Sequence, residues 1–130
     1  MLLSGWRVRK TAAIKREVCK WVDAFNAHGA EEIASLYHEN AVNHQAANAP
    51  VSGIAAIREM FVQEFAAADM TAIAENIFED GQWAIPEWKD PLGLRSGGFF
   101  HVVNGKIRFQ RGCWDNRSFL KQHTLPIEDK

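Results

Sequence analysis

The sequence has few of the residues that mark several large protein classes. It has two cysteines, Cys19 and Cys113, which lie far apart and form no Cys-x-x-Cys pair, so we expect no disulfide framework and no cysteine metal site. We expect both thiols to be reduced and buried. Basic and acidic residues number 15 and 16, which leaves a net charge of −1. A general nucleic-acid-binding surface needs a large positive excess and is therefore excluded.

Long apolar runs are also missing. The chain has no run of about 18 apolar residues, the length that spans a membrane. Leu2 and Leu3 are followed at once by polar and basic residues, unlike a secretory leader. We therefore expect a cytoplasmic protein with no membrane partner. Its 130 residues suffice for one domain, which we place at 11–127 after a flexible lead-in at 1–10.

Aromatic residues, in contrast, are plentiful. The chain has five Trp and eight Phe but a single Tyr. Indole rings are costly to leave exposed, so this number in one small domain implies either a thick core or an aromatic-lined cavity.

Apolar periodicity predicts helices in the first half of the chain. A stripe with helical spacing predicts a helix over 11–26 and consists of Ile14, Val18, Trp21 and Phe25. Shorter patterns predict a second helix over 30–37, a short strand over 41–45 and a third helix that begins at Ser52-Gly53.

After Asp69 the period changes to that of strands. Strands are predicted over 70–78, 83–89, 98–103 and 106–114, with a last helical turn over 116–122. Pro86 indicates an edge position or a bulge, and Asn104-Gly105 favours a type I′ hairpin turn. Helices followed by hairpin-linked strands indicate an α+β fold with the helices on one face of a curved sheet.

Five local strings occur in a fixed order along the chain: 21–28 (WVDAFNAH), 36–42 (LYHENAV), 53–57 (GIAAI), 104–107 (NGKI), and Trp114-Asp115 with Phe119-Leu120. In this order they resemble nuclear transport factor 2-like domains, and the last resembles the ending of their SnoaL-like (polyketide cyclase-like) members. The resemblance implies a cone-shaped α+β fold, in which N-terminal helices pack on a curved, mostly antiparallel sheet and leave a pocket at the wide end. It also implies a homodimer through the outer sheet face.

Two catalytic patterns of this superfamily are broken in the sequence. In alignment with ketosteroid isomerase-like members, the oxyanion-hole tyrosine falls on Trp21 and the carboxylate base on Gln45, which cannot take a proton from carbon. In alignment with limonene-epoxide-hydrolase-like members, the Arg-x-Asp pair falls on Glu87 to Lys89 in swapped order, and the second Asp falls on Gly112.

The remaining candidate catalytic residues lie late in the chain. Asp115 is the nearest match to the acid/base Asp of SnoaL-like cyclases, and it is equally placed to cap a helix that starts at Asn116. Arg111 lies in an apolar strand and needs a carboxylate or a cavity, so we predict a Glu87–Arg111–Asp115 cluster, either a site or a structural ion network. His44 is a candidate base or a rim histidine.

Candidate ligand contacts are aromatic. Trp21 aligns with a pocket position, and Trp83 shares strand parity with Glu87, so we expect both rings to face a cavity. Three more aromatic residues are predicted to contact the ligand: Tyr37, which lies at a predicted helix end outside the aligned pocket, Trp114 and Phe100.

The sequence leads to two functional hypotheses. One is a SnoaL-like domain that binds a small hydrophobic organic molecule, with cofactor-independent acid/base chemistry of cyclase or isomerase type on a carbonyl compound. The other is a non-enzymatic ligand-binding or dimerisation module, and an epoxide-hydrolase-like enzyme is a further alternative. None of the three calls for a cofactor, and irregular histidine spacing indicates no metal site.

Overall fold

A computed structural model describes residues 2–45, 48–122 and 124–126. Its helices are α1 (Leu2–Asn26), α2 (Ala30–Ala34), α3 (Ile54–Ala67) and α4 (Asn116–Gln122). Its strands are β1 (Tyr37–Gln45), β2 (Val51–Ser52), β3 (Ile73–Asp80), β4 (Trp83–Lys89), β5 (Arg95–Val103) and β6 (Lys106–Cys113).

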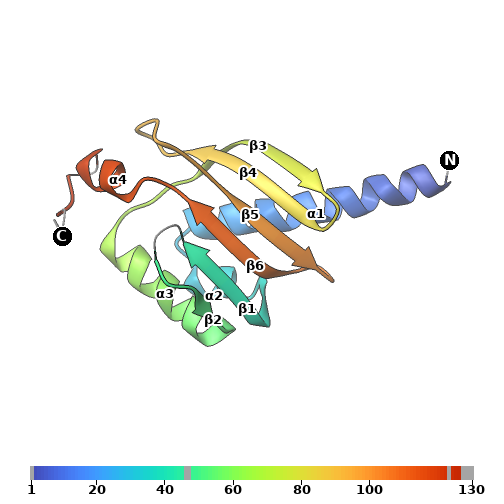
Figure 1. The fold of residues 1–130 in the computed structure, drawn as a ribbon, viewed down its shortest axis with the longest axis horizontal. Coiled ribbons are helices and arrows are strands. Elements are labelled where there is room, and N and C mark those ends of the chain that lie inside the picture. The colour runs from blue at the N-terminus through green and yellow to red at the C-terminus, as the bar shows by residue number, and fades with distance from the viewer. Residues whose placement is uncertain (1, 46–47, 123, 127–130) are drawn as a thin grey trace.

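The six strands form one curved, unclosed sheet in the order β2-β1-β6-β5-β4-β3. All neighbours pair antiparallel except β1 and β6, which are parallel. The helices α1, α2 and α3 cover one face, whereas α4 lies beyond the end of β6 (Figure 1). This is the α+β cone expected from the sequence, with its other sheet face left uncovered by helices.

The core fills the space between α1, α3 and the inner face of the sheet. Side chains at helical spacing, among them Val18 and Trp21 of α1 and Phe61 of α3, are buried against Phe100 of β5 and Ile107 of β6. Burial of each such side chain stabilises the fold by about 1.5–3 kcal/mol. The predicted stripe of α1 is therefore confirmed as the contact surface of that helix.

Three element predictions need correction. The first helix begins at Leu2, inside the segment expected to be a lead-in. The second helix ends at Ala34, because Tyr37 already belongs to β1, a nine-residue strand rather than the predicted five. Strand β4 lies between β3 and β5, so the edge position inferred from Pro86 is wrong. Pro86 pairs in register with Ile77 of β3.

A register shift in β6 decides which of its side chains face inward. Ile107 pairs with Val102, whereas Phe109 pairs with His101, so Arg108 is an extra residue between them. Such a bulge reverses the alternation of the strand. Ile107, Gln110 and Gly112 are therefore buried, and Arg111 is exposed on the outer face.

The structure also tests the predictions on the cysteines and on membrane-spanning segments. Cys19 and Cys113 are free and exposed, so the prediction that they are buried is wrong. Among the described residues, no helix is both long enough and apolar enough to cross a membrane.

Candidate functional site

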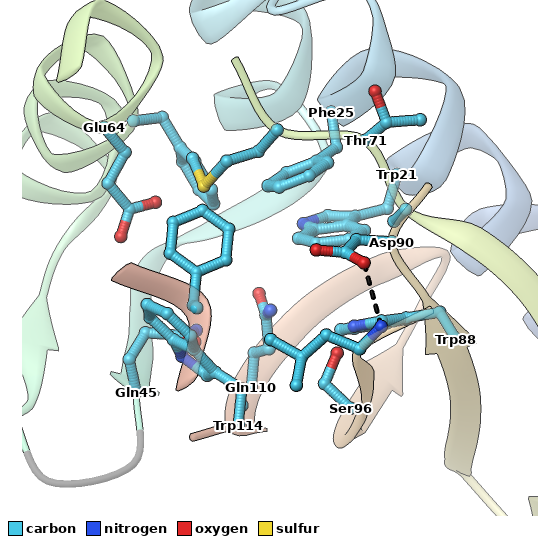
Figure 2. A pocket seen from close by; sticks show the side chains of 16 residues that line it. Trp21, Phe25, Gln45, Glu64, Thr71, Trp88, Asp90, Ser96, Gln110 and Trp114 are labelled. Carbon is cyan, nitrogen blue, oxygen red and sulfur yellow. Dashed lines mark hydrogen bonds between the residues drawn. The ribbon is translucent and has the colours of Figure 1, made fainter. Parts of the chain in front are cut away.

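A cavity opens at the end of the cone, between α1, α3, the inner face of the sheet and α4. The space between its side chains amounts to about 750 Å³, open solvent at the mouth included. Sixteen residues line it (Figure 2): Trp21, Phe25, Gln45, Phe61, Glu64, Met70, Thr71, Ala72, Trp88, Asp90, Leu94, Ser96, Gln110, Gly112, Trp114 and Phe119.

The segment before β3 forms one wall and is held by the end of α1. The side-chain amide of Asn26 donates to the Ala72 carbonyl at 2.9 Å and accepts from the Ala72 N–H at 2.7 Å. His28 Nε2 donates to the Met70 carbonyl at 3.0 Å. These bonds fix Met70 to Ala72 against the helix, so this wall is preformed.

Stacked aromatic rings form a second wall. The Trp21 ring lies between those of Phe25 and Trp88, with centroids 5.0 and 5.5 Å away and interplanar angles of 17° and 15°. Trp21 is only 3% exposed, and Phe61 meets its edge. Offset and edge-on contacts of this kind hold aromatic rings in one arrangement. The cavity therefore offers a fixed apolar surface to a flat, uncharged molecule.

Glu64 brings a carboxylate into this apolar space. It lies one turn after Phe61 on α3 and enters the cavity on the side opposite Asp90 (Figure 2). No described residue donates a hydrogen bond to its carboxylate or forms an ion pair with it. Desolvation raises the pKa of Glu64 to about 7. A carboxyl group with this pKa exchanges its proton readily near neutral pH, as a general acid or base must.

A chain of polar groups lies beneath the cavity floor. The Trp21 indole N–H donates to the Tyr37 hydroxyl oxygen at 3.0 Å, and that hydroxyl donates to Gln110 Oε1. Asn43 Nδ2 donates to the same Gln110 oxygen at 3.0 Å, and Gln45 Nε2 donates to Asn43 Oδ1 at 2.7 Å. Burial holds the pKa of Tyr37 well above its usual value, so the hydroxyl keeps its proton.

Asp90 at the rim has a structural task. Its Oδ1 accepts hydrogen bonds from the backbone N–H groups of Leu92 and Leu94, at 3.0 and 2.9 Å. The carboxylate thereby shapes the turn between β4 and β5. Within the described part of the chain, no three His, Cys, Asp or Glu side chains come together as a metal site.

Asp115, a predicted catalytic residue, caps α4 instead. Its carboxylate accepts from the Ser118 N–H at 3.3 Å and from the Ser118 hydroxyl at 2.6 Å. These bonds lower the pKa of Asp115, and the side chain is exposed. Asp115 is not among the cavity-lining residues, so the helix-cap alternative holds.

Glu87 and Trp83 point away from the cavity. They share a face of β4, as expected, but Ala84, Pro86 and Trp88 occupy the inner one. Glu87 accepts from Asn76 Nδ2 at 2.9 Å on the outer face. The expected direction was wrong because both faces of β4 carry apolar residues.

Arg111 and His44 also lie on the outer face, and the predicted Glu87–Arg111–Asp115 cluster does not form. Arg111 approaches His44 Nδ1 at 3.3 Å and lies over the Phe109 ring at 5.0 Å from its centroid. The bulge at Arg108 explains the error, because it moves Arg111 to the face opposite Ile107.

The aromatic predictions divide into two groups. Trp21 and Trp114 line the cavity, as expected. Phe100 and Tyr37 are buried beneath it, and neither is among the lining residues. The positions aligned with ketosteroid isomerase-like members, Trp21 and Gln45, do both line the cavity.

Sequence reasoning missed Glu64, Gln110 and Trp88. Glu64 follows Ile57 and Phe61 at seven and three residues, which places a carboxylate on the apolar stripe of a helix, and that pattern is a usable signal. Gln110 had no such signal, because strict alternation places it on the outer face.

The comparisons with known proteins now identify the family. Residues 18–110 match the SnoaL-like domain family, and this chain belongs to it. It therefore lies within the nuclear transport factor 2-like superfamily. No curated protein matches the sequence.

Solved structures share the fold at low sequence identity. A hypothetical protein with a ketosteroid isomerase-like fold from Catenulispora acidiphila, in complex with trimethylamine, has a TM-score of 0.76 at 15% identity over 85% of this chain and 93% of its own. SalBIII, an epoxide hydrolase/cyclase-like enzyme of pyran ring formation in polyether salinomycin, has a TM-score of 0.68 at 21% identity over 80% and 92%. TerC, co-crystallised with polyporic acid, has a TM-score of 0.73 at 14% sequence identity, and the match covers 84% of this chain and 96% of TerC.

Proposed function

We propose that this protein binds a small hydrophobic carbonyl compound in its cavity and moves a proton on it, with Glu64 as the acid/base and without a cofactor. The observation that carries the proposal is a carboxyl group with a pKa of about 7 in a cavity lined mostly by apolar side chains, six of them aromatic. Asp115 and Glu87, the earlier candidates for this role, lie outside that cavity.

The proposed reaction is proton exchange next to a carbonyl group. The Glu64 carboxylate takes a proton from the α-carbon, the C–H electron pair forms a C=C bond, and the C=O π pair moves to oxygen. Reprotonation of the enolate by the Glu64 acid completes an isomerisation or exchange. The apolar walls favour this role, because they keep the carboxylate poorly hydrated and therefore basic.

Epoxide hydrolysis receives less support. SalBIII is named as an epoxide hydrolase/cyclase-like enzyme, and its likeness to this chain concerns the fold. The pair that would activate water in this chain, Glu87 with Lys89, lies on the face of β4 opposite the cavity. Lys89 Nζ instead approaches Glu75 at 3.9 Å.

The proposal is tested by deuterium incorporation into 2-indanone, a flat aromatic ketone with acidic α-protons. Proton NMR in D₂O gives the exchange rate with wild type, with Glu64→Gln and with Glu59→Gln, a control on the exposed side of the same helix. We expect wild type and the control to accelerate exchange equally and Glu64→Gln to be slower by about 100-fold or more.

Equal rates with wild type and Glu64→Gln would contradict the catalytic role. Saturable binding of 2-indanone with no acceleration by any of the three proteins would also contradict it, and would favour the non-enzymatic binding module.

The outer sheet face supports a second part of the proposal, a homodimer. Phe78, Trp83 and Phe99 are exposed by 58%, 37% and 41%, and their strand parity places all three on that face. An exposed apolar patch of this kind marks an interaction surface. We expect sedimentation velocity to show a dimer, and Phe99→Glu to show a monomer. A monomeric wild type would contradict this part.

We also propose a cytoplasmic location, which suits the two free thiols.

A further inference from the structure

Gln110 presents an unused pair of hydrogen-bond donors to the cavity. Its side chain lines the cavity, although the residue is only 1% exposed. Its Oε1 accepts from the Tyr37 hydroxyl and from Asn43 Nδ2. No described residue accepts a hydrogen bond from its Nε2. An amide N–H₂ at a cavity wall that has no protein acceptor is available to an acceptor atom of a molecule that enters the cavity.

The orientation of this amide follows from the two groups that donate to the Tyr37 hydroxyl oxygen. The Trp21 indole N–H can only donate, and it does so at 3.0 Å, while Asn43 Nδ2 donates to the same oxygen at 3.3 Å. With both lone pairs of the hydroxyl oxygen occupied, its single proton is left for Gln110, which offers Oε1 as the acceptor. Because Oε1 accepts from Tyr37 and Asn43, Nε2 is the amide atom that is left without a partner among the described residues.

We infer that Gln110 donates the hydrogen bond that holds the carbonyl oxygen of the ligand, and that Trp21 and Tyr37 are the positioning residues that aim it. This inference rests on the proposed function, in that the ligand is a carbonyl compound. In the reaction above, one N–H of Gln110 stabilises the negative charge that develops on oxygen, while Glu64, now a carboxylic acid, holds the proton.

The charges of the lining narrow the ligand class further. Glu64 and Asp90 are its only ionisable side chains, and none of the sixteen lining residues is Lys, Arg or His. A carboxylate ligand would meet two acidic groups and no cation in a poorly solvated space. These charges therefore disfavour an anionic ligand, and the aromatic walls together with the Gln110 amide suit a flat molecule with an acceptor oxygen, such as an aromatic ketone.

The test compares 2-indanone with indane, which has the same shape without the oxygen. We expect the bound carbonyl of 2-indanone to shift its infrared band to lower wavenumber in wild type, and 2-indanone to bind roughly tenfold more tightly than indane. Gln110→Met should remove both effects. Gln63→Met is the matched control, because Gln63 is exposed on α3, lies outside the cavity and donates its amide N–H to Glu59, and it should keep both.

Tyr37→Phe tests the positioning role. Loss of its hydroxyl frees the Gln110 oxygen from one of two donors, so we expect a weaker carbonyl shift and a smaller 2-indanone preference while indane affinity stays the same. A merely structural role would weaken both ligands equally and would overturn the positioning assignment.

Gln110→Met leaves two buried donors unpaired, so a measurement on wild type guards against its failure to fold. Addition of 2-indanone should shift the Gln110 side-chain amide NMR signals more than those of Gln45. An unshifted carbonyl band and unmoved Gln110 signals in saturated wild type would overturn the inference. If the shift is present and deuterium exchange is absent, the inference stands and the proposed catalytic function fails.

Discussion

The indole N–H of Trp21 donates to the Tyr37 hydroxyl oxygen at 3.0 Å, between two side chains that are both buried. In the sequence alignment with ketosteroid isomerase-like members, the oxyanion-hole tyrosine falls on Trp21, which indicates a missing phenol donor. In the structure, the phenol of Tyr37 is bonded to the Trp21 indole and donates to Gln110, and Gln110 lines the cavity.

The Trp21–Tyr37 bond is expected to stabilise the fold. In a double-mutant cycle of Trp21→Phe and Tyr37→Phe, measured by urea unfolding, we expect a coupling free energy of about 1 kcal/mol, the typical net worth of a hydrogen bond. If the losses in unfolding free energy of the two single variants simply add in the double variant, the Trp21–Tyr37 bond does not contribute to stability.

The stability of the protein should depend on pH through Glu64. Its pKa is about 7 when folded against 4.5 ordinarily, so its stabilising contribution is full below pH 4.5 and is lost as pH rises through 7. Glu64→Gln removes this loss. We expect the variant to match wild type at pH 4.5 and to exceed its free energy of unfolding by roughly 3 kcal/mol at pH 8. Parallel stability curves from pH 4.5 to 8 would contradict the raised pKa.

The predicted catalytic residues that lie outside the cavity should be dispensable for the chemistry. We expect Glu87→Gln, Arg111→Met and Asp115→Asn each to exchange the α-protons of 2-indanone at the wild-type rate, because none of them lines the cavity. Asp115→Asn should lower the melting temperature, since it weakens the bonds to Ser118. A loss of exchange in Asp115→Asn would restore it as a catalytic candidate.

Two glycines on the inner face offer a matched pair of substitutions. A methyl group on Gly98 would lie 2.6 Å from the backbone oxygen of Arg111, which cannot move freely, so Gly98→Ala should cost about 1–3 kcal/mol. A methyl group on Gly112 would meet the end of the Gln45 side chain, which can move. We expect Gly112→Ala to cost less stability and to weaken 2-indanone binding. Equal stability losses in urea unfolding would contradict this distinction.

Local signals in the sequence predict most of the fold. Asn104-Gly105 specifies the β5–β6 turn, and both residues adopt the positive φ that a type I′ turn needs, 52° and 77°. The apolar stripe of α1 predicts its buried face. The predicted bounds of β4 are those observed, since a strand of alternating residues between two turn signals has little freedom.

The candidate site is less accessible to sequence reasoning. The alternation of side chains along β4 correctly places Trp83 and Glu87 on the same face of the strand. It does not tell which face points inward, because the opposite face, which carries Trp88, is equally apolar. In β6, the bulge at Arg108 turns Gln110 toward the cavity and Arg111 toward the outer face. No local sequence pattern predicts this bulge.

The proposed chemistry requires Glu64 to be a base at neutral pH, and titration of its carboxyl group measures this property. Carbon-13 NMR of side-chain carboxyl-labelled glutamate, with Glu64→Gln to assign the signal, follows the carboxyl group from pH 4 to 9. We predict a midpoint at about pH 7, as its desolvated position dictates. A midpoint near 4.5 would mean that water reaches the carboxylate freely, and it would contradict the proposed chemistry.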